Sequence, residues 1–163
     1  MRYWSFPPWR EPAQARAYLE RALAESAAGS VLAWAIADRA SDALIGTATL
    51  HSLHREQARA ELGYSLSPEW QGRGLASEAL RLVLEHAFGP MQLRRLEADV
   101  DPRNLASCRL LERLGFRREG LLRARWHVAG EDCDSAIYGL LAHEHEHAQA
   151  GAMDAAETEG AAW

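Results

Sequence analysis

The chain contains 163 residues, of which 48% are apolar and 25% are charged. This size and composition are typical of one folded domain and exclude a wholly disordered or fibrous chain. No apolar run approaches the roughly 18–20 residues that a membrane helix needs, and the first residues lack the hydrophobic segment of a signal peptide. We therefore expect a cytoplasmic protein without membrane partners.

The charged residues restrict the possible mechanisms. All 18 basic residues are arginines, so neither a Schiff-base lysine nor a phosphate-loop lysine can operate here. The net charge is −5 because 23 acidic residues oppose them. Five of these acids follow Ala142, and without them the body of the chain is neutral. A neutral body gives no electrostatic surface for general nucleic-acid binding.

The apolar periodicity predicts one α/β (α+β) domain over residues 1–142, with a mixed, mostly antiparallel sheet. The strand expected over residues 31–37 is a short apolar run, which is typical of a buried strand. The predicted elements, in chain order, are a helix over 11–28, strands over 31–37, 43–50 and 58–66, a helix over 74–88, a strand over 96–101, a helix between Asn104 and Gly115, and strands over 116–128 and 134–141.

The inward faces of these elements follow from their spacing. In the 58–66 strand, Ala60 and Leu62 share one face and Glu61 the other. The stripe expected to face the core from the 74–88 helix includes Leu82, and that of the next helix includes Leu105.

Residues 143–163 show no periodic apolar face and are predicted to form a disordered tail. His143, His145 and His147 alternate with glutamates there, which favours a solvated tail over a metal site. The two cysteines, Cys108 and Cys133, form no Cys-x-x-Cys pair, so free thiols are expected and a zinc site is not.

The most informative motif lies between the 58–66 strand and the 74–88 helix. Two glycines there, Gly72 and Gly74, allow the backbone to turn tightly and to approach a ligand. Free N–H groups at the helix start form an anion site that suits a diphosphate. Many strand-to-helix turns contain Gly-x-Gly for steric reasons alone, so this pattern needs support from other motifs.

Two further motifs supply that support, and the three together resemble the Gcn5-related N-acetyltransferase (GNAT) superfamily. The loop is similar to the acetyl-CoA loop of that superfamily, and the segment from Asn104 to Phe116 is similar to its following helix. The run from Glu61 to Pro68 resembles the RimJ/RimL-like branch, which acetylates ribosomal-protein N-termini. The matching motifs are Gln71-x-x-Gly74-x-Ala76, Asn104 with Gly115-Phe116, and Glu61-Leu62-Gly63-Tyr64-Ser65-Leu66-Ser67-Pro68.

This resemblance implies a sheet with helices on both faces and acetyl-CoA as co-substrate, without a metal. In the family, the strand ending near Leu66 pairs with the pantetheine arm, and Asn104 and Ser107 hold the arm from the opposite wall. Asn104 is equally typical of a plain helix N-cap, and it can serve both roles. The diphosphate would be held by Gln71, Gly72, Arg73, Gly74, Leu75 and Ala76.

The implied reaction is attack of a neutral amine on a thioester within one ternary complex. Glu61 is the best candidate base, because its strand approaches the cofactor; the alternative is a solvated or salt-bridged carboxylate. Glu97 and Asp99 could supplement it or attract a cationic substrate. Many superfamily members carry a tyrosine acid where this chain has Leu111, so Ser107 inherits the proton-donor role by resemblance.

The acceptor stays open at this point. A protein N-terminal amine and a small-molecule amine are both compatible with the motifs, and a non-catalytic acyl-CoA-binding module is a further alternative. Trp4, Trp9 and Trp34 could line an acceptor pocket, although aromatic residues more often serve packing.

Family members usually carry a further strand and helix before the Arg2-Tyr3-Trp4 region. If these are absent, the 31–37 strand is expected to form an exposed apolar edge. A partner chain, as in a homodimer, could cover that edge.

Overall fold

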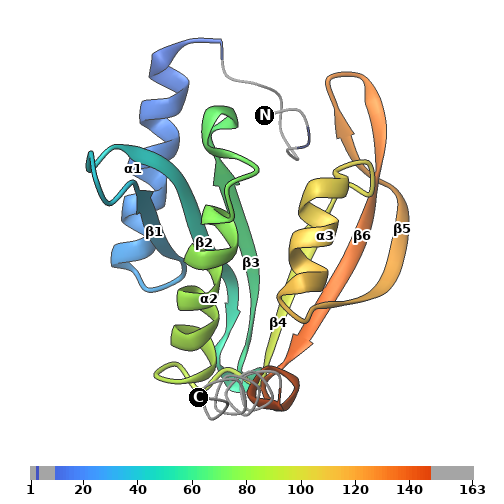
Figure 1. Ribbon diagram of the computed structural model, residues 1–163. Helices are drawn as coiled ribbons and strands as arrows, with labels where there is room; N and C mark the ends of the chain where they lie inside the picture. The colour runs from blue at the N-terminus through green and yellow to red at the C-terminus, as the bar shows by residue number, and fades with distance from the viewer. Residues whose placement is uncertain (1–2, 4–9, 148–163) are drawn as a thin grey trace, which may run out of the picture.

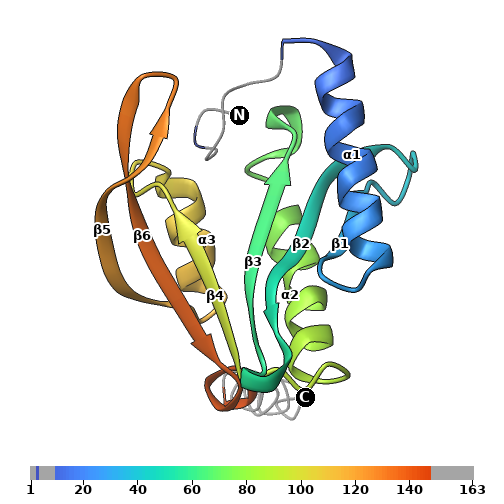
Figure 2. The same cartoon turned by 180° about the vertical axis from the view of Figure 1, so that it is seen from behind.

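The computed structural model describes residue 3 and residues 10–147. At its centre is a six-stranded sheet with the strand order β1-β2-β3-β4-β6-β5. Helices α2 and α3 lie on one face (Figure 1), and α1 lies on the other face beside β1 (Figure 2). The elements are α1 (Pro12–Ala27), β1 (Leu32–Ala37), β2 (Leu44–His54), β3 (Arg59–Leu66), α2 (Leu75–Phe88), β4 (Arg95–Val100), α3 (Leu105–Arg113), β5 (Arg117–Val128) and β6 (Glu131–Leu141).

The sheet is mixed and mostly antiparallel, as predicted. Every neighbouring pair of strands is antiparallel except β3 and β4, which are parallel. The α2 helix connects these two strands, as the crossover of a parallel pair requires.

The hydrophobic core lies between the sheet and helices α2 and α3. On β3, Ala60 and Leu62 point into it, and on β4, Leu96 and Ala98 do the same; each is at most 3% exposed. In these two strands, the residues that face the core are therefore the ones that the sequence predicts. It follows that Glu61, Glu97 and Asp99 point to the opposite face of the sheet.

Strands β3 and β4 separate after a short common stretch. Their parallel register covers only three residue pairs, from Arg59↔Arg95 to Glu61↔Glu97. Beyond Glu61, β3 stays paired with β2 alone, and beyond Glu97, β4 stays paired with β6 alone. Both figures show the two strands diverging. We call this separation the splay.

Several elements differ in detail from the prediction. β1 is not a buried strand: its residues alternate between half-buried and exposed, and within the described residues it pairs only with β2. β6 begins at Glu131, so the turn before it is two residues long, Ala129 and Gly130. Leu82 and Leu105, expected to face inward, are 63% and 60% exposed.

The first residues of the predicted tail have a defined structure. Residues 142–147 are helical, and His145 is buried with its ring 5.1 Å from that of Phe88. Burial in this position lowers the pKa of His145. The first residues assigned to a disordered tail are thus folded, while 148–163 lie outside the described residues. In the part of the chain that the structure describes, no helix is both long and apolar enough to cross a membrane.

Candidate active site

The loop before α2 has the geometry of an anion cradle. Gly72 and Gly74 adopt φ angles of +75° and +80°, a region that favours glycine. A Cβ atom placed on either glycine would meet nothing within 4 Å, so the space beside the backbone is open. Gly74 is the N-cap of α2, and no side chain caps the helix there. The first N–H groups of α2 are consequently left for a ligand.

The side chains of this loop fasten it to the end of β3. Gln71 Nε2 donates a 2.9 Å hydrogen bond to the carbonyl of Leu66. The guanidinium of Arg73 lies 5.1 Å from the centre of the Trp70 ring. The Gln71 side chain therefore supports the loop from the end of β3, and Arg73 adds a positive charge beside the loop. This loop accordingly fits a diphosphate.

Glu61 stands at the point where the splay begins. It is half-buried, and within the described residues its carboxylate has no hydrogen bond or ion pair. Of the two alternatives for Glu61, the structure therefore shows no salt bridge, whereas a solvated carboxylate agrees with it as well as a base does. Glu61 lines a cavity of about 60 Å³ together with Glu97, Ala98, Asp99, Arg125 and Ile137.

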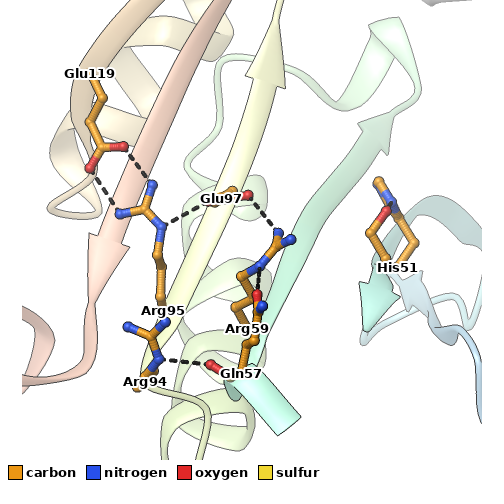
Figure 3. A network of polar contacts seen from close by, with 8 residues as sticks. His51, Gln57, Arg59, Arg94, Arg95, Glu97 and Glu119 are labelled. Carbon is orange, nitrogen blue, oxygen red and sulfur yellow. Dashed lines mark hydrogen bonds and ion pairs between the residues drawn. The ribbon is translucent and has the colours of Figure 1, made fainter. Parts of the chain in front are cut away.

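The neighbouring Glu97 is neutralised by two arginines (Figure 3). Arg59 lies 3.2 Å from one oxygen of its carboxylate, and Arg95 lies 2.8 Å from the other. Arg95 also holds Glu119 through two hydrogen bonds of 2.9 and 2.5 Å, which raise the pKa of Arg95 and lower that of Glu119. Glu97 is therefore a structural carboxylate in this conformation, not a supplementary base.

Asp99 is also paired. Its carboxylate accepts hydrogen bonds from Arg125 Nε at 2.9 Å, from Trp126 Nε1 at 3.3 Å and from the hydroxyl of Ser135. The β5 register shifts between Leu122 and Trp126, where Ala124 has a φ of +48°. This bulge allows two consecutive side chains, Arg125 and Trp126, to reach the same aspartate.

Asn104 and Ser107 meet at the first turn of α3. Asn104 Oδ1 accepts a hydrogen bond from the backbone N–H of Ser107, at 3.3 Å, so Asn104 is the predicted N-cap. The Ser107 hydroxyl lies 2.5 Å from the hydroxyl of Tyr64. Because Tyr64 belongs to β3 and Ser107 to α3, this contact spans the splay on the helix side of the sheet.

The sequence did not indicate Tyr64, Arg59, Arg95 or Arg125 as site residues. Tyr64 lies in phase with Ala60 and Leu62, a pattern that predicts packing alone. Arg59 and Arg125 carry no local signal, because their carboxylate partners lie 38 and 26 residues away in the chain. Arg95 has one near partner, Glu97, and one 24 residues away, Glu119. Trp4 and Trp9 lie outside the described residues. Trp34, on β1, packs edge-on against His86 of α2, with ring centres 5.7 Å apart.

Comparison with known proteins identifies the family. Residues 1–117 match the acetyltransferase (GNAT) domain family. An uncharacterized N-acetyltransferase of Bacillus licheniformis is 33% identical over 144 residues, which cover 88% of this chain and 81% of that protein. The chain belongs to the GNAT acetyltransferase family, and its activity class is acetyl-CoA-dependent N-acetyl transfer.

Two Escherichia coli relatives have named acceptors. The ribosomal protein uS5 alanine N-acetyltransferase is 32% identical over 113 residues, covering 69% of this chain and 58% of that protein. The spermidine N(1)-acetyltransferase is 30% identical over 110 residues, covering 66% and 58%. The chain thus spans less than two thirds of the length of these two enzymes.

Solved structures share the fold, and one of the two described here contains CoA. An acetyltransferase from T. thermophilus superposes with a TM-score of 0.78 and 32% identity, over 91% of this chain and 78% of that chain. Mycobacterium smegmatis RimJ, solved with CoA disulfide, superposes with a TM-score of 0.71 and 28% identity, over 84% and 69%. The RimJ-like resemblance of the sequence is confirmed.

Proposed function

We propose that this chain transfers the acetyl group of acetyl-CoA directly to the N-terminal amine of a protein or peptide. Acetyl-CoA supplies a thioester, an acyl group activated for attack by an amine. The open cradle at Gly72 and Gly74 would hold the diphosphate, with the other loop residues from Gln71 to Ala76 around it. Leu66 and Asn104 would flank the pantetheine arm from the two sides of the splay.

The observation that carries the proposal is the unpaired carboxylate of Glu61 at the head of the splay. An acceptor amine arrives as an ammonium ion at neutral pH and must lose a proton before it attacks. Glu61 accepts that proton, directly or through a water molecule. Its neighbours Glu97 and Asp99 are held by arginines and are not free to do so.

The charge balance of the cavity favours a peptide over a polyamine. Of its three carboxylates, Glu61 alone is uncompensated, because Arg59 and Arg95 pair with Glu97 and Arg125 pairs with Asp99. Such a cavity attracts one ammonium group and offers no second unpaired carboxylate to a further positive charge. A polyamine acceptor is the second candidate, supported by the similarity to the spermidine enzyme.

Neither cysteine is suited to an acetyl-enzyme route, which supports direct transfer. Cys108 is buried in the core, and the Cys133 sulfur is engaged by Arg103 at 3.2 Å. Within the described residues, neither thiol contacts a histidine that could activate it. An acetylated cysteine that passes its acetyl group to an amine would overturn the ternary-complex mechanism.

A Glu61→Gln variant tests the proposed base. Glutamine preserves size and hydrogen bonding but removes basicity, so the rate of peptide acetylation at neutral pH should fall by roughly 10²–10⁴-fold. The loss should shrink at high pH, where the free amine is abundant, while acetyl-CoA affinity changes little. The measurement is the pH–rate profile, with spermidine as competing acceptor and Glu56→Gln, an exposed carboxylate outside the cavity, as control.

Three outcomes would count against the proposal. A wild-type pH–rate profile in Glu61→Gln would exclude Glu61 as the base. Faster transfer to spermidine than to every peptide tested would show that the acceptor is a polyamine and not a peptide. Tight acetyl-CoA binding with no transfer to any amine would leave only an acyl-CoA-binding module.

A cytoplasmic location and a homodimer, both expected from the sequence, are also part of the proposal.

A further inference from the structure

Tyr64 has a polar contact that the proposed mechanism has not used. Its ring packs against the hydrophobic core, yet its hydroxyl reaches across the splay to Ser107 Oγ at 2.5 Å. A second and longer contact, 3.4 Å, joins the same hydroxyl to the Ser107 carbonyl. Tyr64 and Ser107 therefore form a pair of hydroxyl groups between β3 and the first turn of α3.

We propose that Tyr64 is a positioning residue that orients the Ser107 hydroxyl as a hydrogen-bond donor toward the departing sulfur of CoA. This inference rests on the proposed function, because it assigns a role within the same transfer reaction. It concerns the stabilisation of the leaving group, not the removal of the amine proton.

The direction of the hydrogen bond follows from the chemistry of the two hydroxyls. Each carries one hydrogen, and a phenol is a stronger donor than an aliphatic alcohol. Burial raises the pKa of Tyr64 to about 12, so the phenol keeps its proton at neutral pH. When Tyr64 donates to Ser107 Oγ, the hydrogen of Ser107 is left to bond elsewhere. The splay beside it is where the pantetheine arm is proposed to lie.

The chemical step then balances as follows. The acceptor nitrogen forms a bond to the acetyl carbon as the carbon–sulfur bond breaks, and the electron pair of that bond stays on sulfur. The acceptor nitrogen loses one proton to Glu61 before attack and a second as the amide forms, and Glu61 passes each of them on to solvent. The thiolate leaves with a hydrogen bond from Ser107 and takes its proton from solvent. Tyr64 keeps its own proton throughout.

The test compares Tyr64→Phe with a matched control, Tyr138→Phe. Tyr138 is also buried and also hydrogen-bonded, to Glu112 at 3.2 Å, but Glu112 lies in the last turn of α3, whereas Ser107 lies in the first. Both changes keep the aromatic ring and remove one hydroxyl. Tyr64→Phe should lower kcat by roughly tenfold with little change in the KM for acetyl-CoA, since one hydrogen bond is worth about a factor of ten. Tyr138→Phe should leave kcat near the wild-type value.

A second measurement does not depend on turnover. A donor aimed at sulfur favours the thiolate form of bound CoA, so its thiol should ionise at a pH about one unit lower in the wild type than in Tyr64→Phe. The ultraviolet absorbance of the bound thiolate follows this titration directly. Ser107→Ala should reproduce the shift, and the double variant should add little to either single change.

The results separate this inference from the proposed function. An active wild type whose thiol titration is the same in Tyr64→Phe would overturn the inference and leave the proposed function standing. A wild type that acetylates no amine, but shows the titration difference, would overturn the proposed function alone. Additive effects of Tyr64→Phe and Ser107→Ala would show that the two hydroxyls do not act together.

Discussion

Gly74 combines two constraints in a single residue. Its φ of +80° is a backbone conformation that costs other residues roughly 1–2 kcal/mol, and the space where a Cβ atom would stand is open. Packing inside the protein thus does not demand glycine at this position, whereas close approach of the proposed diphosphate to the backbone would.

A Gly74→Ala variant should separate strain from ligand approach. We expect a loss of about 1 kcal/mol in the free energy of unfolding together with a fall of at least tenfold in acetyl-CoA affinity, measured by calorimetry. Gly130→Ala is the matched control, because Gly130 has a φ of +86° and open space beside it but lies in the β5–β6 turn. Equal acetyl-CoA affinity in the two folded variants would argue against the cradle.

At the scale of elements, the start of α3 has an observed structural role and a proposed binding role. Asn104 uses its side-chain oxygen as the N-cap, through the 3.3 Å hydrogen bond from Ser107. Its side-chain NH₂ group has no partner among the described residues. That group is accordingly available for a carbonyl of the pantetheine arm.

The two roles of Asn104 can be tested with two substitutions. Asn104→Asp keeps the cap oxygen and loses the NH₂ donor, so stability should hold while acetyl-CoA affinity falls by about tenfold. Asn104→Ala loses both, and the free energy of unfolding should drop by about 1 kcal/mol as well. Chemical denaturation and calorimetry give the two quantities. Unchanged acetyl-CoA affinity in Asn104→Asp would show that Asn104 acts only as the N-cap of α3.

Most elements could be predicted because their signals are local. The phase of β3 and β4 follows from alternation, and the ends of α2 and α3 follow from glycines and a cap. Leu82 and Leu105 were assigned to the wrong face, since α2 buries Leu80 and Leu84 instead and Leu105 lies at the exposed first turn of α3.

The site was less predictable than the fold because its contacts join distant segments. The loop glycines, Glu61, Asn104 and Ser107 belong to motifs that can be recognised in the sequence. Whether a carboxylate is paired with an arginine cannot be recognised in the sequence, because the partners are distant. Arg125 and Asp99 are 26 residues apart, and Arg95 and Glu119 are 24 apart. The Tyr64–Ser107 contact spans 43 residues and depends on how far β3 and β4 diverge.

At the scale of the whole molecule, the splay divides the sheet into two half-sheets, β1-β2-β3 and β4-β6-β5. Among the described residues, three residue pairs and the Arg59–Glu97 ion pair bridge them on the sheet, and Arg94 adds hydrogen bonds to the carbonyls of Gln57 and Ala58 just before β3. The splay therefore creates two inner edges in addition to the outer edge at β1, and the backbone groups along those edges are not satisfied by a neighbouring strand.

This division has a consequence for amide hydrogen exchange. Amides of β3 beyond Glu61 and of β4 beyond Glu97 that point into the splay should exchange quickly in the free protein, because local opening there breaks few hydrogen bonds. Acetyl-CoA bound between the half-sheets should slow the exchange of these amides, and the melting temperature should rise with ligand concentration.

The amides along the outer edge of β1 serve as the internal reference, and their exchange should not change. Ligand-induced protection at β1 alone, with none at the inner edges, would place acetyl-CoA elsewhere. With acetyl-CoA in the proposed place, the co-substrate would contact both half-sheets and stabilise their relative position, which the short β3–β4 junction alone does weakly.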